Sequence, residues 1–113
     1  MSKYIWAALN QCDLTGLEAQ VATMETLDGK HIRLFRDHKG WYRIVLFATC
    51  APDSGISAVV VEPSGEIHFK HTARHHRGHN YTRNLQAVLT LCGVHWYKSE
   101  LLSEAGAACY KNS

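Results

Sequence analysis

Leu17-Glu-Ala-Gln-Val-Ala-Thr-Met-Glu-Thr-Leu27-Asp28-Gly29-Lys-His-Ile-Arg-Leu-Phe-Arg36 is the segment that decides the fold. Residues 17–27 predict a strand, and residues 31–36 predict a second strand that returns beside it. Asp28-Gly29 between them is typical of a two-residue turn, because such turns need positive φ angles and match the twist of the two strands. A β-hairpin is therefore the strongest local prediction in the chain.

Further strands follow the hairpin. A turn at residues 38–40 precedes a strand over 41–49, which is apolar on both of its alternating faces. This pattern indicates a central strand that is covered on both sides. A homodimer, in which a second subunit supplies one of those covers, is a hypothesis from this pattern. After a loop at 51–55, strands over 56–62 and 66–72 are joined by a turn at 63–66. Five strands with short glycine-containing turns predict an antiparallel meander.

Helices are predicted before the first strand and after the fifth strand. An N-terminal helix capped by Ser2 is indicated by apolar residues spaced as i, i+3, i+4 and i+7. A second helix, capped by Asn80 or Thr82, ends at Gly93 in the left-handed conformation. Residues 94–98 favour a short sixth strand over a continuation of that helix, and Ser99 caps a last helix over 100–110. The apolar faces of the first two helices comprise Ile5, Ala8, Leu9 and Cys12, and Leu85, Val88, Leu89 and Cys92.

The resulting prediction is one α+β domain over residues 1–113. It has a five- to six-stranded, mostly antiparallel meander sheet packed by an N-terminal helix and one or two C-terminal helices. The length of 113 residues, with 46% hydrophobic and 19% charged residues, is typical of a single globular domain. No apolar stretch approaches the roughly 18 residues of a membrane span, and the apolar start is too brief for a signal peptide. We therefore expect a cytoplasmic protein with no membrane partner.

The four cysteines are widely separated and form no Cys-x-x-Cys pair. In a reducing compartment they are expected to be free thiols that behave as small buried hydrophobes. An extracellular protein with two disulfides is the alternative. Cys50 follows a predicted strand, where a nucleophile can lie, although a plain buried residue is the simpler interpretation.

Charge is concentrated in two parts of the chain. Residues 67–99 contain no Asp or Glu and hold six of the eight histidines, and residues 30–43 form a second basic block opposed only by Asp37. We expect these parts to form one basic, histidine-rich surface. Its predicted binding residues are Lys70, Arg74, His75, His76, Arg77, His79 and Arg83, extended by Arg33 and Arg36.

Such a surface predicts a small non-enzymatic protein that binds an anionic partner and needs no cofactor. Nucleic acid is one candidate, because Lys, Arg and a helix N-terminus hold phosphates, while Tyr81, Trp96 and Tyr97 could stack on bases. A protein-interaction module, or a small inhibitor or adaptor of an acidic protein, is the alternative, since Arg, Trp and Tyr are enriched in binding hot spots. Exposed histidines normally charge as the pH falls from about 7 to 5.5, which should strengthen either interaction.

Metal sites and catalysis have weaker signals. His76-x-x-His79 and Cys92-x-x-His95 have the layout of a zinc site, but the predicted helix of about 16 Å between them would hold the two pairs apart. We therefore assign no metal. A remote alternative is a metal-dependent nuclease of the HNH type, which the residues His68, Asn84 and His95 resemble at intervals that do not match. No catalytic residue is assigned.

Overall fold

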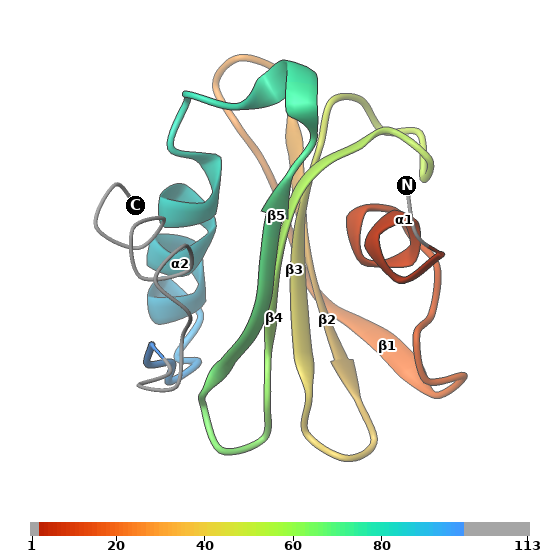
Figure 1. Ribbon diagram of the computed structural model, residues 1–113, viewed down its shortest axis with the longest axis vertical. Coiled ribbons are helices and arrows are strands. Elements are labelled where there is room, and N and C mark those ends of the chain that lie inside the picture. Colours follow the sequence, from red (N-terminus) through yellow and green to blue (C-terminus); the bar gives the residue numbers. More distant parts are fainter. Residues whose placement is uncertain (1–2, 99–113) are drawn as a thin grey trace.

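The computed structural model describes residues 3–98. It has one antiparallel sheet of five strands in the order β1-β2-β3-β4-β5, which confirms the predicted α+β meander (Figure 1). The elements in chain order are α1 (Lys3–Leu9), β1 (Glu18–Glu25), β2 (His31–Asp37), β3 (Tyr42–Phe47), β4 (Gly55–Val61), β5 (Ile67–Thr72), the 3-10 turn η1 (Arg74–His76) and α2 (Tyr81–Leu91).

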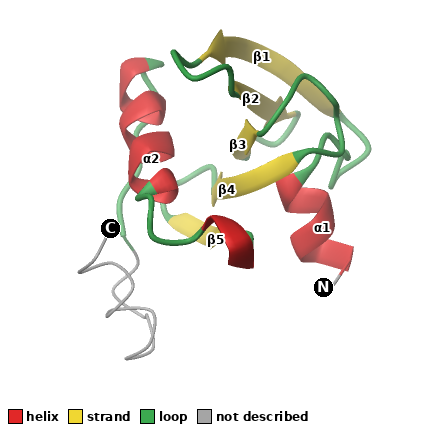
Figure 2. Ribbon diagram, turned by 90° about the horizontal axis from the view of Figure 1, so that it is seen from above, coloured by secondary structure: helices red, strands yellow, loops and turns green. Residues whose placement is uncertain are grey.

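The two helices cover opposite faces of the sheet (Figures 1 and 2). Side chains of β3 alternate between them: Ile44 belongs to the core beneath α2, and Val45 belongs to the core beneath α1. Leu89 of α2 and Leu9 of α1 are fully buried in these two cores. The strand is therefore central and covered on both sides, as predicted. Both covers come from the chain itself, which removes the reason for expecting a second subunit over this strand.

The first hairpin forms where the sequence predicts it, but its turn is longer. The Thr26 N–H donates to the Lys30 carbonyl (2.8 Å), and the Gly29 N–H donates to the Thr26 carbonyl (3.0 Å). Residues 27–29 therefore form a three-residue loop, in which Gly29 alone has a positive φ, of 83°. This is the second common way to connect two strands, with glycine in the left-handed position, and it corrects the two-residue turn.

Arg43, from the second basic block, is buried and joins α1 to the sheet. Its guanidinium pairs with Glu18 of β1, and the two side chains are 2% and 8% exposed. The same guanidinium donates through Nη1 to the carbonyls of Ala7 and Ala8, both at 3.3 Å, and of Asn10. These carbonyls belong to the C-terminal end of α1, where helix carbonyls have no intrahelical partner.

The second helix differs from the prediction at both ends. Asn80 occupies the N-cap position, as predicted, but it is in the left-handed conformation (φ 57°) and its side chain makes no capping hydrogen bond. Leu85 and Leu89 are buried as predicted, whereas Cys92 is exposed. Cys92 lies beyond the last helical residue, so it no longer follows the apolar face. Gly93 has a φ of 80°, which confirms its left-handed conformation.

The predicted sixth strand is reduced to a single bridge. Tyr97 pairs with Glu66 in parallel, through bonds from the Ile67 N–H to the Tyr97 carbonyl (2.9 Å) and from the Tyr97 N–H to the Gly65 carbonyl (2.8 Å). The predicted cap at Ser2, the cap at Ser99 and the helix over 100–110 lie outside the described residues.

The cysteines of the described segment, Cys12, Cys50 and Cys92, are free thiols, as predicted. Their predicted role as buried hydrophobes is wrong for Cys50 and Cys92, which are exposed, while Cys12 is partly exposed. Cys109 lies outside the described residues. Between residues 3 and 98, no helix has the length and apolar character that crossing a membrane requires.

Candidate anion-binding site

A cavity of about 500 Å³ lies between the end of β5, η1 and the start of α2. The Ala73 N–H extends the pairing with β4 by donating to the Ile56 carbonyl (2.7 Å), and the chain then turns through η1 and Gly78, which has a φ of 90°. We call this the basic cavity. It is lined by Lys70, His71, Thr72, His76, Arg77, Gly78, His79, Asn80, Tyr81 and Thr82.

The basic cavity is electropositive for two reasons. None of its described lining residues is Asp or Glu, and Arg77 lies at its wall with Nε donating to the Thr72 carbonyl (3.3 Å). The N-terminus of α2 opens onto the same space, and no side chain caps it. The first N–H groups of a helix have no intrahelical acceptor and carry the positive end of the helix dipole, which makes them suitable for an anion.

Aromatic and histidine rings border the basic cavity. The His79 ring stacks on Tyr81, with centroids 5.3 Å apart and an angle of 27°. Burial, and secondarily the charge of Arg77, lowers the pKa of His71 from its ordinary value of 6.5. Lys30 lies close enough to Tyr81 to interact with its phenol, although Lys30 is paired mainly with Asp28.

Most of the predicted binding residues are near this cavity. Four of them line it, namely Lys70, His76, Arg77 and His79. Arg74 and His75 are exposed in η1, and Arg83 is exposed on the first turn of α2 without lining the cavity. Of the aromatic residues expected to stack on bases, Tyr81 lines the cavity. Trp96 is engaged elsewhere, donating through Nε1 to the Gln86 carbonyl (3.0 Å) and to Thr90 Oγ1 (2.9 Å).

Arg33 and Arg36 do not extend the basic surface. Residues three apart on a strand point to opposite faces of a sheet. Arg33 lies on the α1 side, where it donates to Gln11 Oε1 and to the Cys50 carbonyl, the latter at 3.1 Å. Arg36 lies on the α2 side, 5.7 Å from the centroid of Tyr42. It is near the turn between β2 and β3, at the end of the sheet away from η1 (Figure 1).

The residues of the two metal-based alternatives are not brought together. His76 and His79 precede α2, whereas Cys92 and His95 follow it. Within residues 3–98, no group of three or more His, Cys, Asp or Glu side chains is placed to hold a metal ion. For the HNH-like set, the His68 ring contacts Trp41 and Tyr4 on the α1 side of the sheet, while Asn84 is part of α2 on the other side.

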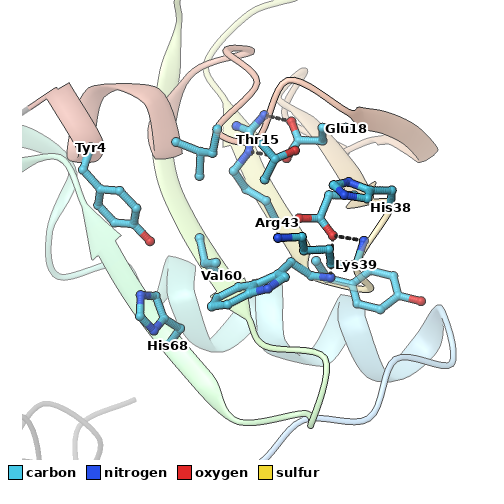
Figure 3. Close-up of a pocket in the computed structure, with 12 residues that line it drawn as sticks. Tyr4, Thr15, Glu18, His38, Lys39, Arg43, Val60 and His68 are labelled. Atoms are coloured by element: carbon cyan, nitrogen blue, oxygen red, sulfur yellow. Dashed lines mark hydrogen bonds and ion pairs between the residues drawn. The ribbon is translucent and has the colours of Figure 1, made fainter.

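A second cavity, of about 370 Å³, lies on the α1 side and was not predicted (Figure 3). We call it the aromatic cavity, because the ring-bearing residues Tyr4, Trp41 and His68 line it; Asp37 is also one of its lining residues. Burial raises the pKa of the Tyr4 phenol above its ordinary value of 10.0. One sequence signal could have indicated this cavity: Asp37 is the single acidic residue within the basic block of residues 30–43.

Any function must follow from the chemistry of these side chains. Comparison of the chain with protein-family models, with curated proteins and with solved structures finds no match.

Proposed function

We propose that this protein is a small non-enzymatic binding protein whose basic, histidine-rich surface holds phosphate groups of a nucleic acid. The observation that carries the proposal is the basic cavity, where Arg77 and the uncapped N-terminus of α2 line the same space without a described carboxylate. Arginine binds phosphate through two parallel hydrogen bonds, and helix N–H groups supply further donors.

The surroundings of the cavity support a phosphate-bearing polymer. Arg74 and Arg83 are exposed on either side of it along the chain, so phosphates before and after a bound one would meet further positive charge. Tyr81, stacked with His79 at the cavity, offers a ring for a base. Base–aromatic stacking contributes roughly 1–3 kcal/mol and tolerates any sequence, so binding is expected to be salt-sensitive with little sequence preference.

The test is fluorescence anisotropy with labelled single- and double-stranded DNA and RNA over a range of salt concentrations. We expect Arg77→Ala to weaken binding of all sequences and to lower the slope of log K against log salt by roughly 1, the effect of losing one phosphate contact. Arg36→Ala is the matched control, because it removes the same charge at the far end of the sheet. It should leave both the affinity and the slope nearly unchanged.

Three results would count against the proposal. If no nucleic acid binds at about 50 mM salt, where phosphate contacts are strongest, the surface does not serve this purpose. If Arg77→Ala and Arg36→Ala weaken binding equally, the interaction depends on net charge and not on the cavity. Displacement of a weakly bound oligonucleotide by polyglutamate at charge-matched concentration would favour an acidic protein partner instead.

A further inference from the structure

The aromatic cavity has the construction of a small-molecule site. The His68 ring meets Trp41 edge to face, with centroids 5.1 Å apart at 87°, and lies 6.4 Å from the Tyr4 ring. In Figure 3, Tyr4 and His68 lie at one end of the cavity, and His38 and Lys39 lie at the other, with Arg43 and Glu18 between and above them. A volume of about 370 Å³, aromatic walls and few polar groups are typical of ligand pockets.

Asp37 has a carboxylate oxygen that the described chain leaves without a partner. The residue is only 5% exposed. Its Oδ1 accepts the N–H groups of Lys39 and Trp41, both at 2.9 Å, which fixes the direction of the carboxylate. Its Oδ2 is buried and has no hydrogen-bond partner among the described residues, although the residue lines the aromatic cavity. Because buried polar atoms are almost always satisfied, this oxygen calls for a donor from outside the chain.

The charges around the cavity indicate which donor fits. Arg43 and Glu18 are buried and paired with each other, so their charges largely cancel. His38 and Lys39 are exposed, which allows their side chains to remain in water at the rim. Among the described residues that line the cavity, Asp37 is therefore the buried charged side chain for which no ionic partner is seen, and it favours an N–H donor that is positively charged or strongly polarised.

We propose that the aromatic cavity binds a small planar molecule with an amidine- or amino-type N–H donor, which displaces the side chains that bury Asp37 Oδ2 and bonds to this oxygen while its ring lies against Trp41. The carboxylate then gains a charge-assisted hydrogen bond, and the aromatic walls attract both the ring and its positive end. This site is independent of the basic cavity and has the opposite charge preference, because it selects donors and cations instead of anions.

The first experiment compares two probes of the same shape, benzamidine and benzoate, by ¹H–¹⁵N NMR of the full chain. Benzamidine should shift the amides of Lys39 and Trp41 and the Trp41 indole N–H, with a Kd on the order of 1 mM for a fragment of this size. Benzoate should bind at these resonances at least tenfold more weakly. Shifts of residues 76–82 instead would report the basic cavity and would not support this site.

Asp37→Asn is the sharpest variant, because its Oδ1 can still accept the two backbone N–H groups while an N–H₂ group replaces Oδ2. It should abolish the preference for benzamidine over benzoate. Asp53→Asn, which makes the same change in an exposed loop, should preserve that preference. Trp41→Phe keeps the Asp37 carboxylate but replaces the indole with a smaller ring. It should lower the affinity for benzamidine several-fold without changing which probe is preferred.

Three outcomes would overturn the proposal. Equal affinity for benzamidine and benzoate would show that the ligand does not bond to Asp37. If a folded Asp37→Asn variant still prefers benzamidine to benzoate, the ligand does not bond to Asp37. If that variant does not fold, Trp41→Phe serves as the test, and an unchanged affinity for benzamidine would overturn the ring contact. Absence of shifts near Trp41 with about 10 mM of either probe would mean that a water molecule alone satisfies Oδ2.

Discussion

Removing the guanidinium of Arg43 should destabilise the protein more than removing any exposed positive charge. In Arg43→Met, Glu18 would lose its ionic partner while 8% exposed, and three carbonyls at the end of α1 would lose a donor. Breaking a buried ion pair from one side typically costs about 3–5 kcal/mol, because the remaining charge stays buried and uncompensated. Domains of this size are stable by only about 5–15 kcal/mol, so this loss is a large fraction of the total.

Urea unfolding followed by tryptophan fluorescence measures this loss. With an m value on the order of 1.5 kcal/mol per M, a loss of about 3–5 kcal/mol lowers the midpoint by roughly 2–3 M. Arg36→Met is the matched control, because Arg36 is exposed on the opposite face and contacts Tyr42 without an ion pair. Its cost should be about 1 kcal/mol or less.

A double-mutant cycle separates the ion pair from the helix contacts. Glu18→Gln leaves Arg43 bonded to the α1 carbonyls and should cost about 1–3 kcal/mol. Because the two residues interact directly, the double variant Glu18→Gln/Arg43→Met should be more stable than the sum of the single effects predicts, by about 1–3 kcal/mol. If Arg43→Met costs less than about 1 kcal/mol, or no more than Arg36→Met, then Arg43 does not join α1 to the sheet.

Three further predictions concern other contacts. Gly55→Ala would place its Cβ 1.4 Å from the Leu9 carbonyl oxygen, so it should cost at least about 3 kcal/mol in urea unfolding and weaken hydrogen-exchange protection in α1. The pKa of His71 is lowered by burial, so its contribution to stability is present above pH 6.5 and is lost as the pH falls through the folded pKa. The wild type should therefore lose stability relative to His71→Gln in acid, and parallel curves would contradict this. The hydrogen bond to Lys30 lowers the pKa of Asp28 to about 2, so any stability difference between wild type and Asp28→Asn should persist above pH 3.8 and disappear as the pH falls through about 2, as thermal melts can show.

The sequence predicts the strands well because their boundaries depend on local chemistry. Gly40 and Gly65 have φ angles of 89° and 97°, values that other residues rarely adopt, so each marks a turn from the sequence alone. The length of the first turn, in contrast, could not be predicted from local sequence. Asp28-Gly29 fits loops of two or three residues, and the choice depends on bonds that the dipeptide does not contain, such as that from the Lys30 N–H to Thr26 Oγ1 (2.9 Å).

The candidate sites, too, were predictable where their residues are close together in the sequence and not where they are far apart. The basic cavity was partly predictable, because its residues are close together in the chain and contain no acid to neutralise them. The exclusion of Arg33 and Arg36 could have been predicted from the alternation of a strand. The burial of Arg43 could not, because it is compensated by Glu18, which is 25 residues away, and by α1 carbonyls more than 30 residues away. A charge count treats such an arginine as part of a surface.

The two cavities can be tested separately because of how β5 is built. The pairing of β4 with β5 shifts between Val60 and Val61, and His68 turns to the α1 side, where it meets Trp41. Lys70 lies opposite Val59, a residue of the core beneath α2, so it faces the other side of the sheet. The edge strand β5 thus contributes Lys70 to the basic cavity from one face and His68 to the aromatic cavity from the other, while His71, which also lines the basic cavity, lies opposite Ala58 and stacks on Phe69 on the α1 side. Substitutions in one cavity should then add to substitutions in the other without coupling, since additivity is expected for sites that share no contacts.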